Sequence, residues 1–125
     1  MNVLVDTSVI IDYLRGHHGA ERVLEDARTS APLHASEITR LEVLAGMRLN
    51  EERGTRALLS IFTWHPVDTL IAERAGELGR NWLSSHRSID SADLAIAATA
   101  ELTGCDLLTR NVEHFPMFKD LRPPY

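Results

Sequence analysis

Three acidic residues stand in apolar surroundings, where an isolated charge is costly to bury. Asp6 follows the apolar run Val3–Val5, and Glu42 and Asp93 lie in segments rich in leucine, valine and alanine. Because burying an unpaired carboxylate is unfavourable, such residues indicate a shared polar site. Three carboxylates that converge on one cleft would supply the oxygen ligands that a hard divalent cation prefers.

Each acidic residue also has a purely structural interpretation, which the sequence leaves open. Asp6 precedes a predicted helix and could cap it, and Glu42 could form a surface ion pair with a neighbouring arginine. Asp90 and Asp93 stand three residues apart at the start of an alanine-rich helix. Of these two, Asp93 is the better candidate for a metal ligand and Asp90 the better candidate for the helix cap.

Asn111 offers a neutral oxygen donor shortly after the apolar pair Leu107–Leu108. If that pair lies in a strand, Asn111 shares the sheet edge of Asp6 and could orient a water molecule there. Asparagine is also common in turns, which is the structural alternative. The six histidines show no ligand spacing and the sequence has no glycine-rich phosphate loop, so neither a histidine zinc site nor ATP or GTP binding is indicated.

Strands and helices alternate along the sequence. Short apolar runs predict strands at residues 2–5, 33–35, 64–67 and 106–109, and Pro66 restricts the third to an edge or a strand end. Helical patterns are found at residues 7–15, 20–28, 36–49, 51–62, 68–86 and from 89 or 90 to 102, and Gly16 and Gly104 end the first and the last. Phe115, Phe118 and Leu121 in the tail are expected to dock and could form a last edge strand.

This alternation predicts a three-layer α/β/α domain with a central parallel sheet of four to five strands. A length of 125 residues is expected to form a single domain, residues 1–125. No apolar stretch is long enough to span a bilayer, so we expect no membrane association, and a signal peptide is not indicated. Cys105 is the sole cysteine, which fits a cytoplasmic protein. The net charge of −5 argues against a general nucleic-acid coat and leaves a nuclease with acidic metal ligands open.

Four segments strongly resemble the PIN-domain ribonucleases and, among them, the VapC toxins of prokaryotic VapBC toxin–antitoxin modules. They are residues 3–10 (VLVDTSVI), 41–46 (LEVLAG), 93–100 (DLAIAATA) and 108–111 (LTRN). The resemblance covers nearly the full chain in the family's order and spacing. The family's acidic positions map onto Asp6, Glu42 and Asp93, and a further acidic or amide position maps onto Asn111.

The resemblance implies an endoribonuclease that uses Mg²⁺ or Mn²⁺ to cleave RNA phosphodiesters. We expect Asp6 and Asp93 to contact the cation directly, and Glu42 to act through water as an outer ligand or general base. Asp90 is a weaker candidate ligand, one helical turn from Asp93. Because Asn111 is uncharged, the number of metal ions stays open.

The resemblance also implies a homodimer and a cognate VapB antitoxin that inhibits by occupying the cleft, and the RNA substrate could be tRNA, rRNA or mRNA. Candidate substrate contacts are Thr7, Ser8, Arg15, Arg40 and Arg110, the arginines through RNA phosphates. A predicted helical hairpin, residues 37–62, carries apolar residues that could receive an amphipathic partner helix or simply pack in the core: Met47, Leu49, Leu58 and Phe62.

Three other functions share some of these sequence features. A receiver domain needs an acidic pair after the first strand and a lysine near a late strand, but Thr7 follows Asp6 and the sole lysine, Lys119, lies too near the end. A haloacid-dehalogenase-like phosphatase needs a second aspartate two residues after the first, where Ser8 stands. The stronger alternative is a catalytically silent PIN-like module that binds RNA or protein.

Overall fold

The computed structural model describes residues 2–125 and contains a four-stranded parallel sheet. Its strands are β1 (Val3–Val5), β2 (Leu33–Ser36), β3 (Phe62–His65) and β4 (Asp106–Leu108). The strand order is β3-β2-β1-β4, so β1 is an inner strand and β3 lies at an edge, with Pro66 directly after its end. Strands β2 and β3 therefore lie in turn on one side of β1, and β4 pairs with its other side.

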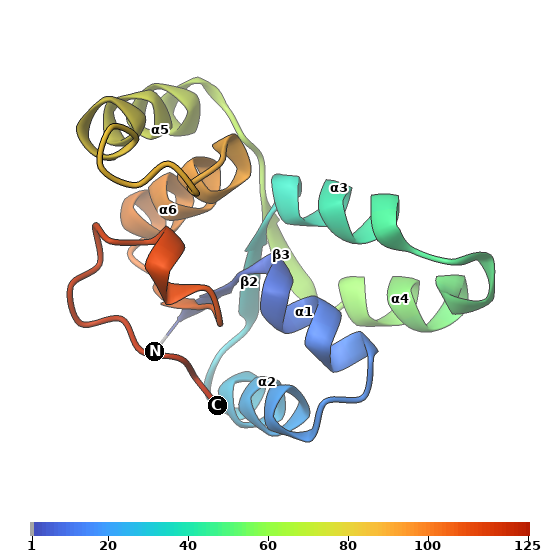
Figure 1. Cartoon of the computed structure of the whole chain (residues 1–125). Helices are drawn as coiled ribbons and strands as arrows, with labels where there is room; N and C mark the ends of the chain where they lie inside the picture. The colour runs from blue at the N-terminus through green and yellow to red at the C-terminus, as the bar shows by residue number, and fades with distance from the viewer. Residues whose placement is uncertain (1) are drawn as a thin grey trace.

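Helices cover both faces of this sheet, which confirms the predicted three layers (Figure 1). One face packs against α1 (Thr7–Leu14), α2 (His18–Ser30) and α4 (Glu52–Leu59), and the other against α5 (Thr69–Trp82) and α6 (Ser91–Thr103). Helix α3 (Glu37–Gly46) contacts both α1 and α6. Two short 3-10 helices, η1 (Leu49–Glu51) and η2 (Val112–His114), lie in the connections.

The central strand β1 has side chains buried on both faces, as expected for a parallel sheet between helices. Val3 and Val5 contribute to the core under α1, α2 and α4, whereas Leu4 contributes to the core under α5 and α6. This alternation follows from the two-residue period of a strand. Because neither face of β1 is open to solvent, a polar residue can reach solvent only beyond the strand end, where Asp6 stands.

Helix α6 is buried over most of its length, and its alanines allow close packing. Ala95, Ala97, Ala98 and Ala100 are all buried, and the helix packs on β2, β4, α3 and α5. Gly104 follows it with a φ of 71°, the left-handed conformation that glycine adopts without strain, so the predicted helix end is confirmed. These contacts hold α6 against the sheet and its neighbouring helices.

Several predicted element bounds were wrong. The fourth helix ends at Leu59 and Phe62 begins β3, whereas the sequence placed Phe62 in the helix. The fifth helix ends at Trp82 instead of His86. Phe115 is fully buried and Phe118 packs on the same core, so the tail docks as predicted, but between residues 2 and 125 it adds no fifth strand. Prolines in this tail lack the N–H group that a sheet ladder needs.

Helices α3 and α4 form the two arms of the predicted hairpin (Figure 1), and the apolar residues named for it have three different environments. Leu58 and Phe62 are buried in the core, Leu49 is almost fully exposed, and Met47 lines a groove described below. Among the helices of the described chain, none has the length and apolar character needed to cross a lipid bilayer.

Candidate active site

The carboxyl ends of β1 and β4 lie side by side and place Asp6 next to Thr109. Val5 pairs with Leu108 in the parallel register, and the backbone N–H of Asp6 donates to the carbonyl of Leu108 at 2.9 Å. Strand order reverses at this pair, because β2 and β3 lie on one side of β1 and β4 on the other. In open α/β sheets this switch point is where ligands bind.

The side chain of Asp6 points to Thr109 and does not cap α1. Its backbone occupies the N-cap position of α1, but the side chain makes no capping hydrogen bond within the described chain. Its Oδ2 atom instead accepts hydrogen bonds from the hydroxyls of Thr109 at 2.7 Å and Ser8 at 2.8 Å. Since both hydroxyls use the same oxygen, Oδ1 is left for solvent or a ligand, although Asp6 is only 4% exposed.

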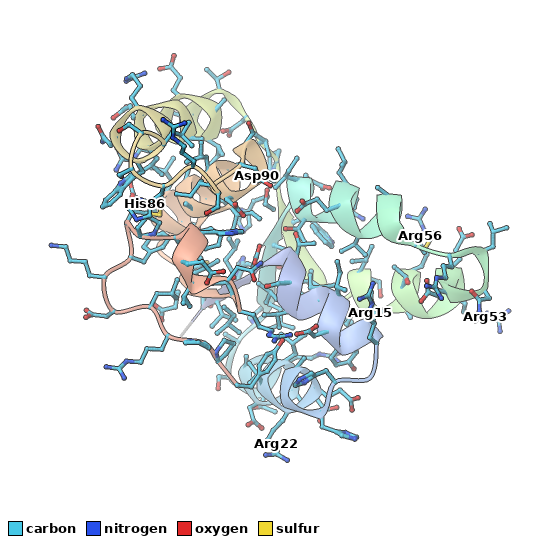
Figure 2. All side chains as sticks on the ribbon, viewed as in Figure 1. Arg15, Arg22, Arg53, Arg56, His86 and Asp90 are labelled. Atoms are coloured by element: carbon cyan, nitrogen blue, oxygen red, sulfur yellow. The ribbon has the colours of Figure 1, made fainter. Side chains whose placement is uncertain are left out.

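Asp93 and Asp90 form a reciprocal capping box at the start of α6. The N–H of Asp93 donates to Asp90 Oδ1 at 2.8 Å, and the N–H of Asp90 donates to Asp93 Oδ2 at 3.1 Å. The prediction that Asp90 is the helix cap is therefore confirmed. Asp93 Oδ2 also lies 3.2 Å from Nδ1 of His114. Figure 2 shows Asp90 at the start of α6.

Burial raises the pKa of Asp93 to about 6, from an ordinary value of 3.8. The backbone hydrogen bond from Asp90 and the charge of His114 oppose this rise, whereas the charges of Asp90 and Asp6 add to it. Asp93 is 9% exposed. The effect of Asp6 on this pKa means that the two carboxylates interact electrostatically, although 87 residues separate them in the sequence. A cation between them would relieve this repulsion.

Glu42 is joined to the same site through Thr7, the residue after Asp6. The hydroxyl of Thr7 donates to Glu42 Oε1 at 2.6 Å and lies 3.1 Å from the hydroxyl of Thr39. Helix α3 is fixed at its start by Ser36, whose hydroxyl accepts from the N–H of Ile38. Glu42 is thus tied to the start of α1 and is not a free surface carboxylate.

The donor set of this site fits Mg²⁺ or Mn²⁺ better than zinc. Among residues 2–125, no three histidine, cysteine, aspartate or glutamate side chains converge closely enough to hold a metal ion by themselves. Mg²⁺ retains several waters and is often bound by only one or two carboxylates. Asp6 and Asp93, both at the carboxyl end of the sheet and interacting by charge, match that requirement. The predicted outer role of Glu42 stays a prediction; the structure ties its carboxylate to Thr7, the residue after Asp6.

The predicted substrate contacts fall into two groups. Thr7 and Ser8 lie in the site, where they hold Glu42 and Asp6 by hydrogen bonds. Arg110 lies beside it, with its N–H donating to the hydroxyl of Ser8 at 3.2 Å. The other two arginines are elsewhere: Arg40 pairs with Glu37 and stacks on Trp64, and Arg15 lies at the far end of α1 (Figure 2).

Asn111 lies near the site through its backbone. Its N–H donates to the hydroxyl of Thr109 at 3.0 Å, and its side chain does not cap η2. The role that the sequence predicted for its amide stays a prediction.

Sequence reasoning missed Thr109 and His114. Thr109 is fully buried, donates to Asp6 and accepts from Asn111, so it couples the ends of β1 and β4. A signal was present, because Thr109 lies at the end of a predicted strand, directly after the apolar pair Leu107–Leu108. His114 contacts Asp93 from η2, and nothing in its sequence context indicates that contact.

Replacing Thr109 with valine should destabilise the protein by about 2 kcal/mol, because a buried hydroxyl bonded to a carboxylate is lost without a change in shape. The matched control is Thr99→Val on α6. Thr99 is equally buried but donates to the neutral carbonyl of Ala95, so its loss should cost about 1 kcal/mol. Urea unfolding at neutral pH with chelator measures both. Equal losses would show that the bond to Asp6 adds nothing beyond an ordinary buried hydroxyl.

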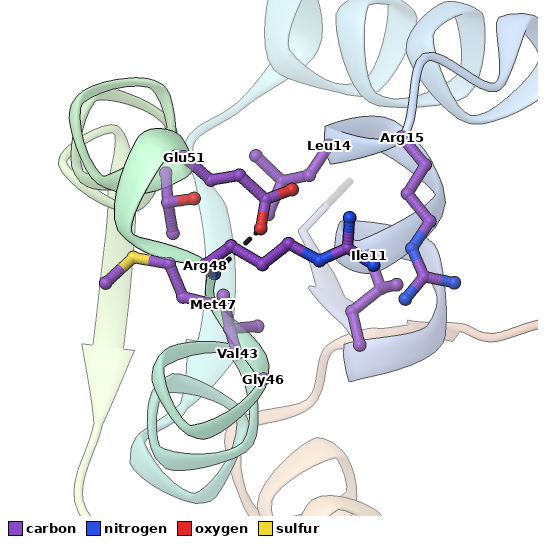
Figure 3. A pocket seen from close by; sticks show the side chains of 9 residues that line it. Ile11, Leu14, Arg15, Val43, Gly46, Met47, Arg48 and Glu51 are labelled. Carbon is purple, nitrogen blue, oxygen red and sulfur yellow. Dashed lines mark hydrogen bonds between the residues drawn. The ribbon is translucent and has the colours of Figure 1, made fainter.

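A groove lies between α1 and the α3–α4 hairpin, and its lining residues do not include Asp6, Glu42 or Asp93. It encloses about 360 Å³ and combines apolar residues of α1 and α3 with two arginines. Figure 3 shows Arg15 and Arg48 reaching into it from opposite walls, while the N–H of Arg48 donates to Glu51 at 2.8 Å. Its apolar side is formed by Ile11, Leu14, Val43 and Met47.

Comparison with known proteins gives consistent matches over nearly the whole chain. Residues 3–119 match the PIN domain family. The chain is 46% identical over 123 residues to ribonuclease VapC19 of Mycobacterium tuberculosis, covering 98% of each protein. A toxin–antitoxin complex from Klebsiella pneumoniae superimposes with a TM-score of 0.82 at 31% identity, covering 98% of each chain. VapBC-1 of nontypeable Haemophilus influenzae does so with a TM-score of 0.75 at 26% identity, covering 98% of this chain and 96% of that one.

Proposed function

This chain belongs to the PIN-domain family, among its VapC ribonucleases, and from that premise we propose that it is an endoribonuclease toxin that requires Mg²⁺ or Mn²⁺. The observation that carries the proposal is the buried carboxylate of Asp6, which Thr109 and Ser8 hold at the switch point of the sheet. A second buried carboxylate, Asp93, has a pKa that the charge of Asp6 helps to raise. Protein carboxylates that are buried near one another are commonly ligands of a cation. The fold and the family predicted from the sequence are confirmed.

Asp6 and Asp93 would hold the cation, and the other residues would hold these two in place. When bound, the cation neutralises charge that builds on the phosphate and lowers the pKa of the attacking water. Thr109 and Ser8 fix one oxygen of Asp6 and leave the other free. The capping box fixes Asp93 at the start of α6.

Glu42 and Asn111 have supporting roles in this proposal. Glu42, held by Thr7, is placed to accept a proton from water as general base or to act as an outer ligand through water. Asn111 would orient a water molecule or substrate oxygen with its neutral amide. Because Asn111 brings no charge, the site carries fewer negative charges than one with an acidic residue there, which favours binding of the RNA phosphate.

The groove of Figure 3 supports a VapB antitoxin as the partner. An amphipathic helix can lay its apolar face on Ile11, Leu14 and Val43, and acidic groups of the partner can pair with Arg15 and Arg48. The similar structures from Klebsiella pneumoniae and Haemophilus influenzae are a toxin–antitoxin complex and a VapBC protein. The proposal also includes a single domain, a homodimer, cytoplasmic location and an RNA substrate, supported by the family and by the single cysteine.

Incubation of the purified chain with total RNA tests the proposal. Fragments should appear with Mg²⁺ or Mn²⁺ and disappear with excess chelator. A preparation of Asp6→Asn, purified in parallel, controls for contaminating nuclease, and equal cleavage by this variant would assign the activity to a contaminant or to a site other than the acidic one. RNA binding without cleavage under any of these cations would instead indicate a catalytically silent RNA-binding module.

A further inference from the structure

A cluster of Asp12, Arg110 and Tyr125 extends the acidic site along α1. The guanidinium of Arg110 donates through Nη1 to Asp12 Oδ2 at 2.8 Å, and the hydroxyl of Tyr125 donates to the same oxygen at 2.6 Å. The N–H of Arg110 meanwhile donates to Ser8, which also donates to Asp6. Ser8 and Asp12 are four residues apart on one face of α1, so Arg110 bridges one helical turn.

The side chain of Tyr125 packs closely against Gly19, which has no side chain of its own. A Cβ atom added to Gly19 would lie 2.9 Å from Cβ and 3.0 Å from Cδ1 of Tyr125, too close for any other residue there without a shift. The imidazole of His17 caps α2 and lies 4.8 Å from the Tyr125 ring. The guanidinium carbon of Arg110 lies 5.7 Å from the centroid of the same Tyr125 ring.

Asp12 is ionised at neutral pH and so keeps its attraction for Arg110. Burial alone would raise its pKa, but the hydrogen bonds from Tyr125 and Arg110 and the charge of Arg110 lower it more, so that it lies below its ordinary value. The Asp12 side chain is 18% exposed and that of Arg110 is 49% exposed. The carboxylate is therefore largely covered, whereas much of the guanidinium faces solvent.

The hydrogen bonds of Asp12 fix the orientation of the Arg110 guanidinium and add little to the stability of the fold. An exposed ion pair contributes only about 0–1 kcal/mol to stability. A guanidinium has five N–H donors in a rigid plane, and with Nη1 used by Asp12 the remaining donors can meet an anion. A guanidinium held in one direction loses less entropy when it binds than a free one does.

We propose that Arg110 binds an RNA phosphate next to the one at the acidic site, and that Asp12 and Tyr125 are its positioning residues. Asp12 stands six residues after Asp6 on α1, or roughly 9 Å along the helix axis, a separation that a neighbouring phosphate of the same strand can cover. Arginine suits a phosphate because its fork can donate two parallel hydrogen bonds. This inference rests on the proposed function, since it needs RNA at the acidic site.

RNA binding at a series of KCl concentrations tests the role of Arg110. The full chain carrying Asp93→Asn, which prevents cleavage, is titrated with a fluorescent single-stranded RNA. Adding Arg110→Gln should weaken binding about tenfold and reduce the slope of log affinity against log salt by about 0.7, the value for one lost phosphate contact. The control Arg80→Gln removes an exposed arginine of α5 and should leave the slope unchanged.

Asp12→Asn separates positioning from simple charge. This change raises the net charge by one, so bulk electrostatics alone would tighten RNA binding. If Asp12 positions Arg110, RNA binding by Asp12→Asn instead weakens about threefold and its salt slope falls. Tyr125→Phe removes only the hydroxyl that donates to Asp12, and it should change RNA affinity and salt slope in the same direction. In the cleavage assay, which uses the chain that retains Asp93, both substitutions should raise KM and leave kcat within twofold. Melting temperatures near that of the parent exclude unfolding as the cause.

The outcomes distinguish this inference from the proposed function. Tighter binding by Asp12→Asn would overturn positioning and show that Asp12 competes with phosphate for Arg110. If the parent chain cleaves RNA with Mg²⁺, an unchanged salt slope on adding Arg110→Gln to the Asp93→Asn chain would overturn the phosphate contact and leave the proposed function standing. Absence of both RNA binding and cleavage would overturn both.

Discussion

Replacing Asp6 or Asp93 with asparagine should lower the rate of metal-dependent RNA cleavage by about 10²- to 10³-fold. Each change removes a negatively charged ligand, and a bound cation commonly supplies several kcal/mol of transition-state stabilisation, of which about 3–4 kcal/mol corresponds to this factor. The two carboxylates would act on one ion, so the double variant should be little slower than either single variant. Initial rates on one RNA substrate at saturating Mg²⁺ measure the effect.

Asparagine is the informative substitution at Asp6 because it keeps the local hydrogen bonds. The carbonyl oxygen of asparagine can take the place of Oδ2 and accept from Thr109 and Ser8, whereas alanine would leave the buried hydroxyl of Thr109 without this acceptor. Removing one of two repelling charges should also keep or raise the melting temperature in chelator. Loss of activity without loss of stability would then be a property of the site.

Asp68→Asn is a matched control for these variants. Asp68 is the N-cap of α5, where its carboxylate accepts from the N–H of Ile71, outside the acidic site. Asparagine caps helices as well as aspartate does, so this variant should cleave RNA at the parent rate. A near-parent rate for Asp6→Asn would place the catalytic centre elsewhere, and a large fall in its melting temperature would indicate a structural role instead.

The acidic site shows which part of a site can be predicted from sequence. The position of Asp6 at a strand end follows from the apolar run before it and from the helix after it. Whether its side chain caps that helix does not, because Thr109 orients it from 103 residues away in the sequence. For Asp90 the cap could be predicted, because the preference for aspartate just before a helix is local. The role of Asp93 as a metal ligand stays a prediction.

The wrong expectations have similar physical causes. Phe62 ends an apolar stretch that suits a helix or a strand equally, and only pairing with β2 decides between them. The tail carries the apolar residues of a buried segment, so its docking could be predicted, but not its irregular path. Arg40 and Arg110 are equally plausible phosphate contacts in the sequence. Tertiary packing stacks Arg40 on Trp64 and places Arg110 beside Ser8.

In the metal-free protein, the contribution of Asp93 to stability should fall as pH rises from about 4 to about 6. The pKa of Asp93 is about 6 in the folded protein and close to 3.9 in an unfolded chain. Between these values the folded state holds a proton that the unfolded state has released, so raising the pH favours unfolding. Below this range both states are protonated and above it both are ionised, so the loss is confined to it. Two pKa units correspond to a loss on the order of 2–3 kcal/mol.

The difference in unfolding free energy between the parent and Asp93→Asn isolates this effect, because other titrating groups are shared. Measured by urea in chelator, the parent should lose stability relative to the variant between pH 4 and 7, and a constant difference would show that burial does not raise this pKa. Saturating Mg²⁺ should stabilise the parent most above pH 6, where Asp93 is ionised, and the variant much less. An ionised Asp93 would then lower the stability of the metal-free protein and raise that of the metal-bound protein. Both effects have the same cause, because the burial that destabilises the charge of Asp93 also strengthens its attraction to Mg²⁺.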